Sequence, residues 1–292
     1  MTGRVLVTGG NGRLGRAVLA ALGDRGVGGV GGEGINGAIA IDSAGTVDAA
    51  RLAGIDAVIN CANLVSGTQA DIEQANRLYA VAVARRARAA GVGRFVQVSS
   101  FSIYGDAERI DGETSLAPQT DYARSKLAAE HELADLATRD FRVVSLRLPF
   151  MFSASEPALL GKLVTAMLKL RMVPVPRGSA SRRSMITYGG AAEALATLAT
   201  APVAAEGVLV AADPQPLDIA LLARTVRARL DTRIAIVPVP AFAARLARAL
   251  APDMVDRLMR SSVLAPSANV LAAGTSAPVA AEIETYLAGM QR

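Results

Sequence analysis

The 292-residue chain contains no tryptophan, one cysteine, one histidine and few tyrosines or phenylalanines. So few aromatic residues fit an α/β protein better than an all-β sandwich. A lone Cys61 cannot form an internal disulfide, which agrees with a reducing compartment. No metal site can be assembled around His131, which we expect to be a surface or packing residue. We therefore expect an α/β protein of the cytoplasm without a metal ion.

Long apolar runs are absent as well. Arg, Asp or Gly interrupts each apolar stretch before it reaches the roughly 18 to 20 residues that span a bilayer. A strand pattern begins at residue 4, which leaves no room for a signal peptide. These features predict neither membrane insertion nor export.

The net charge of +5 comes from arginine far more than from lysine. A positive surface attracts nucleic acid, membranes or phosphorylated small molecules. Here the arginines are scattered at helical spacing beside alanine and leucine, and they form no long basic block. We predict solvated helix faces and no nucleic-acid or membrane partner, with a polyanion-binding surface as the alternative.

Strands and helices alternate over the first 150 residues. Apolar periodicity predicts buried strands at 4–8, 56–63, 94–100 and 142–149, and helices at 12–23, 70–91 and 120–137. This alternation indicates right-handed βαβ units and a parallel sheet. The predicted fold is a doubly wound Rossmann sheet over residues 1–152, followed by a smaller α/β substrate-binding part over 153–292.

The second half of the chain is punctuated by prolines and has shorter elements. Residues 173–184 read as an exposed loop. Residues 240–261 read as helical pieces broken by Pro252. A length of 292 residues suits either one large domain or two modest ones.

Two glycine runs match the dinucleotide-binding pattern G-x-G-x-x-G, one starting at Gly10 and one at Gly26. The first ends an apolar strand and opens an amphipathic helix, as phosphate binding at a helix N-terminus requires. The second follows a helix end and leads into more glycines, which cannot start a stable helix. Only the first run is predicted to bind phosphate.

The second glycine run lies where the second strand of a Rossmann unit is expected. We interpret 27–32 as a poor strand and Glu33 as the carboxylate that binds the ribose hydroxyls. The alternative is a flexible loop with Glu33 in solvent, because glycine weakens a strand. A carboxylate here would repel a 2′-phosphate and favours NAD, while nearby Arg25 leaves NADP possible.

Tyr122 and Lys126 are four residues apart on one predicted helix face. An ammonium group beside a phenol favours the phenolate, so we expect the pKa of Tyr122 to fall below about 10 by roughly 1 to 3 units. Ser100 ends the preceding strand, where its hydroxyl would face the ligand crevice. The three residues form a candidate acid/base site.

With these motifs the chain resembles the extended short-chain dehydrogenase/reductase family, in its nucleotide-sugar epimerase, dehydratase and reductase branch. The matching segments are residues 8–15 (TGGNGRLG), 59–63 (INCAN), 98–105 (VSSFSIYG), 122–126 (YARSK) and 146–149 (LRLP), together with Asn76. The resemblance covers nearly the whole chain and is strongest over residues 1–150.

The resemblance implies roles for individual residues. Tyr122 would exchange a proton with the sugar, and Ser100 would bind the reacting oxygen. Cofactor contacts would come from Gly9, Gly12, Arg13, Leu14, Gly15, Glu33, Asp42, Cys61, Ala62, Asn76, Lys126 and Pro149. Substrate contacts would come from Ser102 and from Arg183, less surely Arg182, whose guanidinium suits a diphosphate. The alternatives are an exposed turn for the arginine pair and simple packing for Cys61.

Two departures from the family pattern bear on the reaction. Dehydratases carry an Asp-Glu pair where this chain has Phe101 and Ser102, which argues against 4,6-dehydration. The segments 152–154 and 188–190 also differ, which leaves the detail of the substrate pocket open. The resemblance implies an NAD(P)-dependent oxidoreductase or epimerase that acts at C4 of a nucleotide sugar, UDP-linked by preference.

The resemblance also implies a homodimer formed through the helices around 70–91 and 120–137. The alternative function is a catalytically silent protein of the same fold that senses NAD(P) or binds RNA. Intact Ser100, Tyr122 and Lys126 argue for the enzyme.

Overall fold

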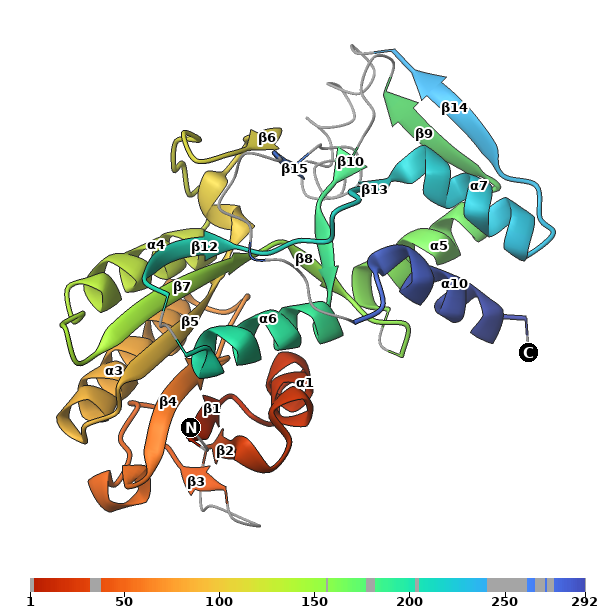
Figure 1. The fold of residues 1–292 in the computed structure, drawn as a ribbon. Helices are drawn as coiled ribbons and strands as arrows, with labels where there is room; N and C mark the ends of the chain where they lie inside the picture. Colours follow the sequence, from red (N-terminus) through yellow and green to blue (C-terminus); the bar gives the residue numbers. More distant parts are fainter. Residues whose placement is uncertain are drawn as a thin grey trace.

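The computed structural model describes residues 3–31, 38–155, 157–176, 182–202, 205–240, 262–265, 271 and 276–291. Its main sheet has seven parallel strands in the order β12-β7-β5-β4-β1-β2-β3 (Figure 1). The strands are β1 (Arg4–Thr8), β2 (Gly26–Val30), β3 (Ile39–Ala40), β4 (Ile55–Asn60), β5 (Arg94–Ser100), β7 (Arg142–Leu148) and β12 (Gly207–Val210). The four predicted strands and the Rossmann fold class are confirmed.

Helices cover both faces of this sheet, as the doubly wound prediction requires. One face carries α1 (Arg13–Leu22) and α6 (Tyr188–Thr200), and the other carries α3 (Tyr79–Ala89) and α4 (Asp121–Ala134) (Figure 1). The helix predicted at 70–91 is continuous but not uniform. It consists of α2 (Gln69–Glu73), a π-helical turn η3 (Gln74–Leu78) and α3.

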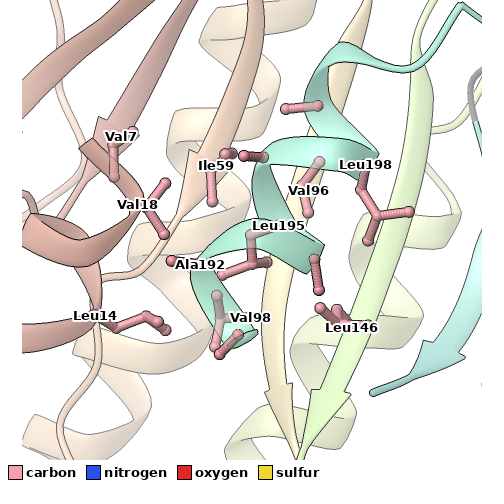
Figure 2. Close-up of a cluster of buried hydrophobic side chains, with 14 of the residues drawn as sticks. Val7, Leu14, Val18, Ile59, Val96, Val98, Leu146, Ala192, Leu195 and Leu198 are labelled. Atoms are coloured by element: carbon pink, nitrogen blue, oxygen red, sulfur yellow. The ribbon is translucent and has the colours of Figure 1, made fainter. Parts of the chain in front are cut away.

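Each central strand is buried on both sides, which explains its continuous apolar sequence. Along β1, Val5 and Val7 face the layer of α1 and α6, whereas Leu6 faces the layer of α3 and α4. Figure 2 shows the first of these two cores, in which side chains of the sheet and of the two helices interdigitate: Val7, Leu14, Val18, Ile59, Val96, Val98, Leu146, Ala192, Leu195 and Leu198.

The glycine-rich second strand is also confirmed. β2 pairs in parallel with β1 on one side and with β3 on the other. Val27 is buried in the core, and a Cβ at Gly29 would lie 2.9 Å from the side chain of Ile41. The glycines therefore make room for neighbouring side chains. Glu33 lies outside the described residues, so its contact with ribose stays a prediction.

The described residues of the C-terminal part have their own small core and contribute strands to four two-stranded sheets. Its elements are β8 (Phe150–Phe152), α5 (Ala158–Leu170), β9 (Met172–Pro176), β10 (Arg182–Arg183), β11 (Met185–Thr187), β13 (Leu217–Asp218), α7 (Ile219–Arg229), β14 (Ala235–Val239), β15 (Val263–Leu264) and α10 (Val279–Gly289). Strand β15 pairs with β6 (Arg109–Ile110), which precedes α4. The described residues also form short 3-10 helices: η1 (Gly23–Arg25), η2 (Ala49–Leu52) and η4 (Phe101–Tyr104).

The prediction of an exposed loop at 173–184 is wrong in its described portions. Residues up to Pro176 belong to β9, which pairs in parallel with β14, and Val173 is buried. Proline lacks a backbone N–H group. It is compatible with an edge strand where that group would face away from the partner strand. The helical pieces predicted after residue 240 fall on 241–261, outside the described residues.

The chain returns to the main sheet after residue 152. Strand β12 pairs with β7, and α6 packs against α1 and the central strands. The division of the chain at residue 152 into cofactor and substrate parts stays a prediction. Among the helices that the structure describes, none combines the length and the apolar character that crossing a membrane needs.

Candidate active site

The loop after β1 lies directly against the loop after β4. Gly9 has a left-handed backbone conformation with a φ of 66°, and a Cβ there would lie 2.8 Å from the backbone nitrogen of Ala62. A Cβ on Gly15 would lie 2.2 Å from the carbonyl oxygen of Gly9. Only glycine allows both approaches. The predicted phosphate loop therefore has the backbone shape that its sequence suggested.

The N-terminus of α1 faces the same loop and is suited to an anion. Gly12 is the N-cap and offers no side-chain cap, and the first turn contains no acidic residue. The first helical hydrogen bond runs from the amide of Arg16 to the carbonyl of Gly12, 2.9 Å away. The amides of the first helical turn, from Arg13 to Gly15, thus point out of the helix end. These residues fit the pyrophosphate of a dinucleotide.

Two predicted cofactor residues use their side chains to hold nearby loops. The Asp42 carboxylate accepts hydrogen bonds from the amides of Thr46 (2.7 Å) and Ala44 (2.9 Å). The buried Asn76 amide accepts from Leu64 N (2.9 Å) and donates to Leu64 O (2.8 Å). Both residues hold loops that follow strands of the main sheet, and their contact with a cofactor stays a prediction. Pro149 is buried between β7 and β8.

Ser100, Ser102 and Tyr122 meet at the carboxyl end of β5. The Ser100 hydroxyl oxygen accepts hydrogen bonds from the Ser102 amide (3.1 Å) and the Ser102 hydroxyl (3.0 Å). The hydroxyl of Tyr122 is hydrogen bonded to the side chains of Ser100 and Asn63. Because Ser100 already accepts from Ser102, its own proton is available to the Tyr122 oxygen or to a ligand oxygen.

Lys126 is 1% exposed, and its ammonium group lies beneath Tyr122. The Nζ atom donates to the carbonyl of Val98 (3.2 Å) and lies 5.8 Å from the centre of the Tyr122 ring. Burial lowers the pKa of Lys126 to about 8, against the opposing effects of Cys61 and Glu130. Burial also raises the pKa of the Cys61 thiol to about 12, so this thiol stays uncharged at neutral pH.

The structure corrects the expected pKa of Tyr122. Burial raises the pKa of this phenol above its ordinary value, and the hydrogen bonds from Ser100 and Asn63 only partly oppose the rise. At this site the cost of removing a phenolate from water outweighs the attraction of the Lys126 ammonium.

Two features of the site were missed from the sequence. Asn63 was noted only as part of a motif, although its position just after a buried strand could have marked it. The second feature is a buried ion pair between Glu130 on α4 and Arg147 on β7. Glu130 follows Lys126 by four residues, just as Lys126 follows Tyr122. This repeated spacing on one helix face was the signal in the sequence that could have identified Glu130.

Arg182 and Arg183 lie apart from this cluster, on β10. This strand pairs with β13, and Arg183 also bridges to Ser262 next to β15. Arg182 is exposed and Arg183 is partly exposed. Their role in binding a diphosphate stays a prediction.

Comparison with known proteins gives a family match over most of the chain. The model of the NAD dependent epimerase/dehydratase family matches residues 5–211. One relative, UDP-glucose 4-epimerase of Vibrio cholerae, is 28% identical over 194 residues, which span 63% of this chain and 58% of that enzyme.

Solved structures agree in fold. MoeE5, solved in complex with UDP-glucose and NAD, has a TM-score of 0.73 and 20% identity, with 99% of each chain covered. UDP-glucuronic acid 4-epimerase from Bacillus cereus, in complex with NAD, has a TM-score of 0.73 and 14% identity, with 99% of this chain and 100% of that chain covered. These likenesses extend over both parts of the fold.

Proposed function

The chain belongs to the NAD dependent epimerase/dehydratase family, and we propose that it uses NAD to epimerise C4 of a UDP-linked hexose or N-acetylhexosamine. The observation that carries the proposal is the hydrogen-bonded pair of Tyr122 and Ser100 above the buried ammonium of Lys126. The similar enzymes from Vibrio cholerae and Bacillus cereus are both named as 4-epimerases of UDP-sugars. These features support an acid/base role for Tyr122 in hydride transfer at a sugar alcohol.

The glycine loop would hold the cofactor. Gly9, Gly12 and Gly15 allow the pyrophosphate to approach the backbone, and the amides of Arg13 and Leu14 face it. When bound, NAD supplies the acceptor and then the donor of the hydride. Cys61 and Ala62 would line the cofactor from the loop after β4, and Glu33 and Asp42 would contact the adenosine side.

The proton would move between the sugar hydroxyl and Tyr122. Ser100 would bind the reacting oxygen, with its hydroxyl oriented by the two hydrogen bonds from Ser102. The positive charge of Lys126 stabilises the phenolate form of Tyr122 whenever the proton has left. Burial of the Lys126 ammonium, whose side chain is 1% exposed, limits the screening of that interaction by water.

The rest of the substrate would lie toward the C-terminal part. Arg183, helped by Arg182, would bind the diphosphate, because a guanidinium group matches phosphate oxygens in pairs. Two copies of the chain would associate through the α2–α3 helix and α4, where Leu78 is 41% exposed. The mass of the purified protein in solution, measured by light scattering, tests the dimer.

The function is tested by incubating the purified protein with UDP-glucose, UDP-N-acetylglucosamine and UDP-glucuronic acid. We expect C4 epimers to form, detected by NMR, with no net change in reduced nicotinamide, and we expect mass spectrometry to find NAD released on denaturation. Stoichiometric use of NADH on a 4-keto sugar would instead identify a reductase. Failure of all substrates, combined with RNA binding that weakens steeply with salt, would support the silent binding protein.

A further inference from the structure

A buried polar cluster lies behind the site, between α4, β5 and β7. Glu130 and Arg147 form its centre and are 3% and 6% exposed. The guanidinium donates to both carboxylate oxygens, with Nε–Oε1 at 3.0 Å and Nη2–Oε2 at 2.6 Å. Ser99 donates to the same carboxylate, and Arg147 donates to the Tyr104 hydroxyl at 2.9 Å. Both charges are therefore paired and hydrogen bonded away from water.

Each member of this cluster is next to a residue of the site. Ser99 directly precedes Ser100, and Tyr104 ends the short helix that Ser100 caps. Glu130 follows Lys126 by one helical turn on the same buried face of α4. The ion pair and its hydrogen bonds thus join α4, which carries Tyr122 and Lys126, to β5 and the short helix after it, next to Ser100.

Lys126 is faced by few groups that could set its charge. From β5 it receives the uncharged carbonyl of Val98, and from α4 the phenol of Tyr122 and the carboxylate of Glu130. From the end of β4 it meets the Cys61 thiol, which burial keeps uncharged up to about pH 12. Glu130, which forms an ion pair with Arg147, is consequently the carboxylate among the groups that act on this ammonium.

We propose that Glu130 and Arg147 are positioning residues that together set the charge of Lys126, with the carboxylate favouring the ammonium form and the guanidinium moderating that effect. Burial by itself favours the neutral amine. A full negative charge on Glu130 opposes burial, and the contact with Arg147 limits how much of that charge Lys126 experiences. The pair would hold Lys126 near the point at which it changes charge.

A purely structural ion pair would behave differently under substitution. Breaking a buried pair from either side destabilises the fold in the same direction. A pair that sets the charge of Lys126 has opposite effects on its titration. Glu130→Gln removes the anion and leaves Arg147 as a second cation, whereas Arg147→Met leaves Lys126 as the cation that faces Glu130.

The composition of the chain makes this titration measurable. It contains three lysines: Lys126, Lys162 and Lys169. Protein labelled with ¹³C at lysine Cε gives one NMR signal for each, and the signal missing from Lys126→Met identifies Lys126. Titration of these signals in the protein without added substrate reports the charge of Lys126 directly.

We expect the pKa of Lys126 to fall by about 1 pH unit or more in Glu130→Gln and to rise in Arg147→Met. Lys162 and Lys169 lie on α5 in the C-terminal part and serve as internal controls. Their signals should respond to pH in the same way in every variant. A Lys126 pKa that is unchanged in both variants, or that shifts in the same direction in both, would overturn the proposal.

The double variant Glu130→Gln/Arg147→Met guards against misfolding of either single variant, because it leaves no unpaired buried charge. Since Glu130 acts on Lys126 from one helical turn away, we expect the pKa of Lys126 to fall in the double variant, by less than in Glu130→Gln. An unchanged value there would also overturn the proposal.

The catalytic consequence rests on the proposed function. The loss of activity at high pH should begin at lower pH in Glu130→Gln and at higher pH in Arg147→Met. Opposite NMR shifts without any turnover would refute the proposed function alone. Turnover with a Lys126 titration that does not respond would refute this inference alone.

Discussion

The region of α4 and β5 and the region of β1 and β2 are built by opposite means. In the region of α4 and β5, buried polar side chains make hydrogen bonds and an ion pair. Lys126 donates to the Val98 carbonyl, and Arg147 pairs with Glu130. On the side of β1 and β2, glycines bring backbone against backbone, as at Gly9 and Gly15. The α4 side should therefore be sensitive to charge and hydrogen bonding, and the β2 side to added volume.

Tyr122→Phe is expected to have the largest effect and acts on the α4 side. It keeps the ring and removes the hydroxyl bonded to Ser100 and Asn63, so kcat should fall by about 10²- to 10⁴-fold while NAD stays bound. Tyr286→Phe is the matched control, because this ring packs on Phe152 in the C-terminal core. Steady-state rates and the nucleotide content of both variants give the answer. Full activity in Tyr122→Phe would contradict the proposed mechanism.

Gly15→Ala is the corresponding change on the glycine side. Its Cβ would lie 2.2 Å from the Gly9 carbonyl oxygen, so α1 must move and the free energy of unfolding should fall by about 1 to 3 kcal/mol. NAD binding should weaken as well, measured by calorimetry beside urea unfolding. Gly31→Ala, whose Cβ meets nothing within 4 Å, is the control. Equal stability of the two variants would contradict close packing of the loop.

A finer comparison is possible within β2. A Cβ on Gly29 would lie 2.9 Å from Ile41 Cδ1 and 3.1 Å from Leu6 Cδ1, so Gly29→Ala should destabilise the fold by about 1 kcal/mol. A Cβ on Gly28 would lie 3.6 Å from its nearest neighbour, Leu19 Cδ1, which is an ordinary contact. Gly28→Ala should therefore be neutral or stabilise the fold by about 0.5 kcal/mol. Urea midpoints measure both. The reverse order would show that the strand does not pack as described.

The smallest expected effect concerns Asp42 at the end of β3. Hydrogen bonds from the amides of Thr46 and Ala44 lower the pKa of this carboxyl. A lowered folded-state pKa stabilises the fold above the ordinary value of about 3.9, and that contribution is lost as the pH falls through the folded-state pKa. Asp42→Asn should therefore lower Tm slightly at pH 7, with a difference that shrinks below about pH 4. A constant difference would exclude the carboxylate charge as its cause.

The elements of the sheet could be predicted because their signals are local. Apolar runs such as 57–59 are buried on both faces. The helices between them carry one apolar face, so sequence periodicity reflects the layers directly. The glycine loop and the spacing of Tyr122 and Lys126 are equally local. The strand at Gly26–Val30 has a weak signal of its own, but its position between two clearly patterned elements predicts it.

What could not be predicted depends on distant parts of the chain. Strand β9 could not be predicted because its partner β14 lies about sixty residues later in the chain. The pKa of Tyr122 depends on burial by surrounding segments, which no spacing of charges reveals. The Glu130–Arg147 pair joins a helix to a strand 17 residues further on.

The π-helical turn at Gln74–Leu78 has a consequence for how the chain tolerates insertions and deletions. A π turn holds one residue more than an α turn, so the segments on its two sides are out of phase by about 100°. The extra residue lies where Asn76 turns inward to hold Leu64. Removal of one residue here would leave a regular helix with Asn76 facing elsewhere, and the loop after β4 would lose its anchor. A one-residue deletion at this turn would thus displace the loop after β4, which holds the predicted cofactor residues Cys61 and Ala62.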